Sequence, residues 1–68
     1  MTLHEAMIVA INGLGGGQIK LGDVADYINK NKLYHRKDKL PVPVNQISAR
    51  LDKYKHLFGR KDGYIWIK

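Results

Sequence analysis

The side chains of this chain that could do chemistry are mostly cationic, and they gather in its C-terminal part. Residues 1–29 carry one basic and three acidic residues, a net charge of −2, whereas residues 30–68 carry eleven basic and three acidic residues, a net charge of +8. This asymmetry predicts a surface that binds a polyanion. Lysines and arginines that only keep a small domain in solution would give the same count. Because the basic residues are spread over several segments, we expect a folded patch rather than a disordered tail.

A group of polar residues falls on a helix expected over residues 43–54. The amides of Asn and Gln can pair bidentately with adenine, and an Arg guanidinium can pair with guanine. The same residues would also suit an ordinary solvated helix surface, and Arg50 could pack its stem over the core. Lys53 is better suited to phosphate than to bases. The candidates for nucleic-acid contacts on this helix are Asn45, Gln46, Ser48, Arg50 and Lys53.

Two further basic groups lie before and after this helix. Arg36, Lys37 and Lys39 belong to a polar connector, residues 32–43, and form a flexible basic segment that could follow a phosphate backbone. Arg60 and Lys61 precede an Asp-Gly turn, where a β-hairpin tip could touch phosphate. Both groups could also be solvated loops. If about six of these bases neutralise phosphates, the logarithm of the binding constant falls against the logarithm of salt concentration with a slope near −5.

Catalytic and metal chemistry finds little support in the sequence. The three histidines, His4, His35 and His56, match no metal-binding spacing and have no acidic partner placed by sequence. The glycines of residues 13–17 follow a helix rather than a strand and lack the Gly-Lys-Ser/Thr ending of a phosphate loop. Ser48 has no His and Asp partners that could activate it as a nucleophile. We expect no enzyme activity, no cofactor, no metal and no small-molecule substrate.

Length and composition narrow the class of protein further. With 68 residues, we expect one domain spanning residues 1–68. The absence of cysteine excludes disulfides and thiolate metal sites. No run of about 20 apolar residues predicts a membrane span, and no signal peptide is recognisable. These features fit an intracellular, cytoplasmic protein that depends on one compact apolar core.

Short sequence motifs indicate where the expected helices and strands begin and end. Thr2 and Glu5 match a capping box at the start of a first helix, and the glycine run ends that helix. Pro43 suits the first position of a third helix. Asp62-Gly63 is a strong signal for a tight hairpin turn. The predicted helices span residues 2–13, 22–31 and 43–54, and the predicted strands span residues 18–21, 57–60 and 64–67.

Apolar residues recur with helical spacing in each predicted helix. In the last strand, we assign Ile65 and Ile67 to the core because they carry no polar group, which leaves Tyr64 and Trp66 on the other face. The residues expected to share the buried faces of the helices are Leu3, Ala6, Met7, Ala10, Ile11 and Leu14; Leu21, Val24, Tyr27, Ile28 and Asn31; and Val44, Ile47, Leu51 and Tyr54.

The order of these elements predicts an α+β fold, a winged helix-turn-helix. Three helices pack together, and the first strand joins the C-terminal hairpin in a small three-stranded antiparallel sheet. In such a domain the third helix can enter the major groove of DNA. The hairpin turn, or wing, then approaches the backbone beside that helix.

Five segments, at residues 3–11, 19–24, 43–51, 57–58 and 63–67, carry a family resemblance that spans nearly the whole chain. Together they resemble the HARE-type helix-turn-helix domain, a winged-helix family, and look most like its bacterial branch. The resemblance implies DNA binding, or docking within DNA-linked systems, without catalysis by the domain itself. Members of the family occur in chromatin-associated proteins, restriction-type endonucleases and the delta subunit of bacterial RNA polymerase. The long basic connector departs from the family's simplest short turn.

Two other functions remain open at the level of sequence. Ile8 and Val9 lie outside the apolar arc of the first helix, and Tyr64 and Trp66 could be exposed on the sheet. These four residues could form an apolar surface for a protein partner or a second copy, so the alternative is a protein-docking module of a transcription, restriction or chromatin-type assembly. A third function is stacking of the aromatic residues on single-stranded bases. Duplex DNA ranks first, protein docking second and single-stranded nucleic acid third.

Overall fold

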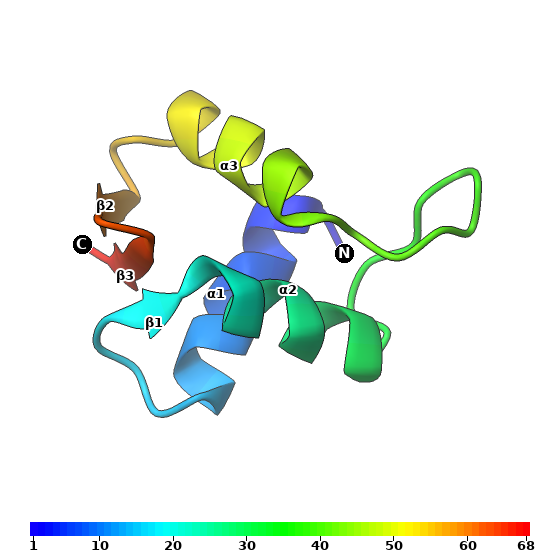
Figure 1. Ribbon diagram of the computed structural model, residues 1–68, viewed down its shortest axis with the longest axis horizontal. Coiled ribbons are helices and arrows are strands. Elements are labelled where there is room, and N and C mark those ends of the chain that lie inside the picture. Colours follow the sequence, from blue (N-terminus) through cyan, green and yellow to red (C-terminus); the bar gives the residue numbers. More distant parts are fainter.

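The computed structural model describes residues 1–68 and contains three helices and a three-stranded antiparallel sheet. This is the predicted α+β arrangement of a winged helix-turn-helix. The sheet lies at one end of the helical bundle (Figure 1). None of the helices has both the length and the apolar character needed to cross a membrane. The elements are α1 (Leu3–Gly13), β1 (Ile19–Lys20), α2 (Leu21–Lys30), α3 (Val44–Lys53), β2 (Phe58–Lys61) and β3 (Tyr64–Ile67).

The sheet has the strand order β1-β3-β2, so the first strand pairs with the last. Ile65 of β3 lies between Ile19 of β1 and Arg60 of β2. The turn between β2 and β3 consists of Asp62 and Gly63, which have φ angles of 52° and 82°. Two positive φ angles are what a type I′ turn requires, so the tight turn predicted from the Asp-Gly pair is confirmed. β1 has two residues rather than the four predicted, because α2 begins at the next residue.

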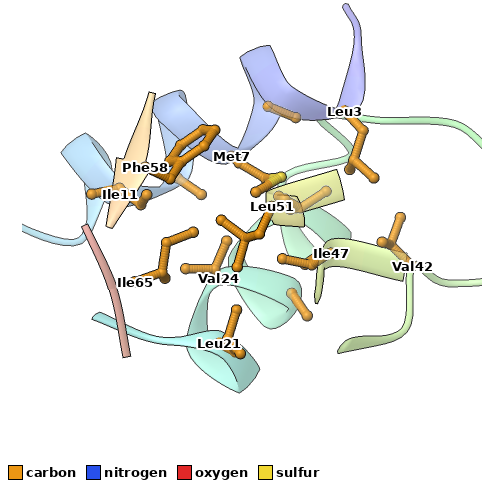
Figure 2. Close-up of a cluster of buried hydrophobic side chains, with 14 residues drawn as sticks. Leu3, Met7, Ile11, Leu21, Val24, Val42, Ile47, Leu51, Phe58 and Ile65 are labelled. Carbon is orange, nitrogen blue, oxygen red and sulfur yellow. The ribbon is translucent and has the colours of Figure 1, made fainter. Parts of the chain in front are cut away.

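A single cluster of 14 buried apolar side chains forms the core. All three helices, the connector before α3 and the C-terminal hairpin contribute to it, and Figure 2 shows their side chains converging. The largest fully buried side chains include Met7 and Ile11 of α1, Ile28 of α2, Ile47 of α3 and Ile65 of β3. Burying each aliphatic side chain of this size contributes about 1.5–3 kcal/mol. No polar or charged side chain is buried, so the core is held by apolar packing alone.

Four residues assigned to the core from periodicity are exposed instead. Leu14 (38% exposed) is the C-cap residue that follows α1, and Asn31 is the exposed C-cap residue that follows α2. Val44 (39%) is the first residue of α3, and Ile67 (36%) is the last residue of β3. At the end of an element the neighbouring turn that would cover the side chain is missing. Periodicity therefore indicates burial reliably only inside each element.

The capping box predicted at the start of α1 is present. Glu5 N–H donates to Thr2 Oγ1 at 3.3 Å, and Thr2 N–H donates to Glu5 Oε1 at 2.9 Å. The Thr2 hydroxyl also donates to Glu5 Oε1 at 2.8 Å. These hydrogen bonds satisfy amides that a helix N-terminus otherwise leaves without partners.

The capping box predicts a dependence of stability on pH. The hydrogen bonds from the Thr2 backbone and hydroxyl favour the charged carboxylate and lower the pKa of Glu5 below its ordinary value. A lowered folded-state pKa gives stability that is present above the unfolded pKa and is lost as the pH falls through the folded pKa. Urea denaturation between neutral and acid pH should show this loss. In Glu5→Gln the loss should shrink, and an unchanged pH profile would contradict the role of Glu5.

Candidate nucleic-acid interface

One side of helix α3 packs against the core, and the opposite side is exposed. Ile47 and Leu51 are its buried residues. The helix begins at Val44, with Pro43 as the N-cap, rather than at Pro43 as predicted. Pro43 supplies no side-chain cap, and the first turn contains no acid that could neutralise the positive end of the helix dipole. Of the predicted contact residues, Asn45 and Lys53 are exposed, whereas Gln46, Ser48 and Arg50 are half-buried.

The exposed stripe of α3 is polar and carries no net charge. Helical spacing places Asn45, Ala49 and Asp52 along its centre with Lys53 beside them, and all four are exposed. The charges of Asp52 and Lys53 cancel, and Ala49 leaves room for another molecule to approach the helix backbone. The cations that dominate this part of the chain lie at the two ends of α3, in the connector and in the wing.

The connector, residues 32–43, is closed at its base by one asparagine of α2. Asn29 Nδ2–H donates to the Val42 carbonyl at 3.0 Å, and Val42 N–H donates to Asn29 Oδ1 at 2.8 Å. Within the connector, Arg36 donates to the Pro41 carbonyl at 3.2 Å and forms an ion pair with Asp38 at 2.8 Å. The sequence predicts a flexible segment here, and in the structure the segment is a hydrogen-bonded loop that projects beside the N-terminal end of α3 (Figure 1).

The connector and α2 enclose an open hollow of about 600 Å³. Four lysine and arginine side chains and one histidine line it, and Asp38 is the only acid within the connector. Lys32 is a lining residue that the sequence analysis does not single out. Its position, two residues after α2 ends, is the signal that could have identified it. The cationic and histidine lining residues are Lys32, His35, Arg36, Lys37 and Lys39.

Two lysines of the hollow have left-handed backbone conformations. Lys32 has a φ angle of 51° and Lys39 a φ angle of 61°. Lys32 follows the end of α2, where Lys32 N–H donates to the Asn29 carbonyl and Leu33 N–H to the Ile28 carbonyl. The same turn ends α1, but there the left-handed position is occupied by Gly15, the usual residue. Strain of this kind is concentrated at functional sites.

Replacing Lys32 by glycine should therefore stabilise the fold and weaken anion binding. We expect the free energy of unfolding in urea to rise by about 0.5–1 kcal/mol, because glycine adopts the left-handed conformation without a steric cost. Binding of any polyanion in the hollow should weaken, since one of its cations is lost. Lys37→Gly is the matched control, because Lys37 has no positive φ and gains no stability from the change. A lower free energy of unfolding in Lys32→Gly would show that the backbone of Lys32 is not strained.

The wing is short and its tip is attached to the body of the protein. The Leu21 amide at the start of α2 donates to the Gly63 carbonyl in the hairpin turn at 3.0 Å. Arg60 and Lys61 are both exposed, and Arg60 lies 3.9 Å from Asp52 of α3 in an ion pair. Arg60 therefore lies beside the C-terminal half of α3 and is shared with a carboxylate of that helix, whereas Lys61 alternates with it along β2.

The residues considered for protein docking do not form one continuous surface. Ile8 and Val9 belong to α1, which packs against the inner face of the sheet, and Ile8 also packs partly against the core. Tyr64 and Trp66 alternate with the buried Ile65 and therefore lie on the outer face of the sheet.

The histidines do not cluster with acids. His4 stacks on Tyr54 with ring centroids 4.1 Å apart, and His56 lies tilted against the same ring at 6.0 Å. His35 lies far along the chain, in the connector hollow. No group of three metal-ligating side chains occurs in the structure.

Comparisons with known proteins return no match. No protein-family model, curated protein or solved structure is similar to this chain at the level of significance required.

Proposed function

We propose that the protein is a non-enzymatic winged-helix domain that binds duplex DNA, as its resemblance to the HARE-type family implies. The observation that carries the proposal is the charge pattern of α3, whose exposed stripe is polar and neutral while cations lie at both of its ends. A helix in the major groove faces base edges and has a phosphate backbone on either side. Polar residues at its centre and cations at its ends match that environment.

Each group would then have a distinct role. Asn45 and Gln46 lie in the first turn of α3 and would pair with base edges, while Ala49 would contact a thymine methyl group. Ser48 and Arg50 would reach bases or phosphates from the edges of the stripe. The connector hollow and the wing would hold one phosphate backbone each and contribute affinity without sequence preference.

The test is a titration of labelled duplex DNA into the protein at about 50 and 200 mM salt, with chemical shifts followed for each residue. Perturbation of α3, the connector and the wing, with an affinity that falls steeply with salt, is the expected result. The absence of shifts in α3 and the wing would contradict duplex binding and favour the protein-docking module. Affinity that does not change with salt would contradict phosphate contacts.

Removing the negative charge of Asp52 should strengthen duplex binding, whereas removing a cation should weaken it. Asp52→Asn removes the carboxylate from the exposed stripe and releases Arg60 from its ion pair, so duplex affinity should rise by about tenfold at 50 mM salt. Fluorescence anisotropy of labelled duplex measures this change. Asp26→Asn on the exposed side of α2 is the matched control and should have little effect. Weaker binding by Asp52→Asn would show instead that the carboxylate accepts a hydrogen bond from a base.

A further inference from the structure

The outer face of the sheet carries aromatic and cationic side chains in a fixed pattern. Side chains alternate across a strand, so the buried Ile65 places Tyr64 and Trp66 on the opposite, outer face. The register puts Lys20 of β1 and Lys61 of β2 directly opposite Tyr64, one on each side. Directly opposed side chains have Cβ atoms about 5 Å apart. The phenol ring of Tyr64 therefore lies between two lysines.

Trp66 lies against the neighbouring strand. Its partner across β2 is Gly59, and a Cβ atom at Gly59 would overlap the indole ring. The strand therefore packs against the indole ring, and the half-buried side chain keeps part of the ring accessible. A ring held in this way has little rotational freedom to lose when another ring stacks on it.

No carboxylate balances the lysines on this face. The ion pairs of the protein are Arg36–Asp38 and Arg60–Asp52, so both Lys20 and Lys61 are free of acidic partners. The five residues that the register places on the outer face are Lys20, Gly59, Lys61, Tyr64 and Trp66. None of them is acidic. A wholly apolar partner would bury the lysine charges at a cost, whereas a partner with regularly spaced anions and flat rings would complement both kinds of side chain.

We propose that this outer face binds an unpaired nucleic-acid strand, with Tyr64 and Trp66 each stacking on a base and the two lysines holding phosphates. Sheets with exposed aromatic residues bind single strands in this way, because every base has a flat face while the bases of a duplex are already stacked on one another. The two rings lie two residues apart along β3, about 7 Å, which is far enough for separate bases. The inference is independent of duplex binding by α3.

The single tryptophan of the chain provides a direct measurement. Oligothymidine of about twelve nucleotides should quench Trp66 fluorescence to saturation. An abasic strand of the same length has the same phosphates without the bases, and it should bind at least about tenfold more weakly. Oligouridine, which carries 2′-hydroxyls and lacks the thymine methyl group, should also bind and quench Trp66, because every base has a flat face on which a ring can stack. Equal binding of the abasic strand, or no binding of any strand, would overturn the proposal.

Variants locate the strand on the protein. Tyr64→Leu and Trp66→Leu should each weaken strand binding by about 5- to 100-fold, measured by anisotropy of a labelled strand. The Lys20→Gln/Lys61→Gln double variant retains both rings and should weaken binding mainly at low salt. Ala49→Glu places a carboxylate on α3, so it should impair duplex binding and leave strand binding unchanged. Unchanged strand affinity in Tyr64→Leu, or its loss in Ala49→Glu, would refute the assigned surface.

Discussion

Replacing Ile47 by alanine is expected to lower the free energy of unfolding by about 2–5 kcal/mol. Ile47 has no exposed surface, and it attaches α3 to the core together with Leu51. A single core in a chain of this length supplies only about 3–5 kcal/mol in total. The variant should therefore be largely unfolded without denaturant, and circular dichroism should show a reduced helical signal and a weak or missing urea transition.

Val44→Ala is the matched control on the same helix. The sequence places Val44 on the buried stripe with Ile47, but the structure leaves it 39% exposed at the start of α3. Its truncation should cost less than about 1 kcal/mol, because an exposed side chain leaves no cavity. Equal losses in the two variants would mean that the start of α3 packs more deeply than described, and a small loss for Ile47→Ala would contradict the core itself.

The contrast between these two positions shows which features of the fold can be predicted from neighbouring residues in the sequence. Inside an element, helical spacing identifies the buried residues, as Ile47 and Leu51 illustrate. The capping box and the Asp-Gly turn are equally readable, because each depends on residues within a few positions of one another. Burial at the ends of elements depends on which distant segment covers the residue. Leu14 and Ile67, both exposed, could not be placed from spacing alone.

The candidate interface was predictable in composition but not in geometry. The sequence indicates a basic connector around Arg36, yet its closure depends on the pairing of Asn29 with Val42, 13 residues away. In the sequence Asp52 is an ordinary surface residue, and only the fold shows that Arg60 lies 3.9 Å from it. Both contacts join segments whose separation in sequence gives no pattern, so only tertiary structure reveals them. The sequence does place Tyr64 and Trp66 on one face, but the lysines beside Tyr64 emerge only from the register of the sheet.

Replacing the lysines of the connector should have the largest effect on duplex binding. Replacing Lys32, Lys37 and Lys39 together by glutamine removes three positive charges from the hollow while retaining side chains of similar length. It also leaves Arg36, which fixes the loop through Asp38 and Pro41, in place. With about six phosphate contacts, the wild-type protein should lose about a thousandfold in duplex affinity between 50 and 200 mM salt, whereas the triple variant, with three contacts, should lose only about fortyfold.

The salt series separates this electrostatic effect from damage to the fold. At 50 mM salt the triple variant should bind duplex about a thousandfold more weakly than wild type, and the two affinities should converge as salt approaches 1 M. A folding defect would instead lower affinity at every salt concentration and would reduce the urea midpoint. Lys20→Gln, on the outer face of the sheet and away from the hollow, is the control for a general loss of positive charge. An unchanged salt slope in the triple variant would exclude the connector from the duplex interface and leave α3 and the wing to carry all of the phosphate contacts.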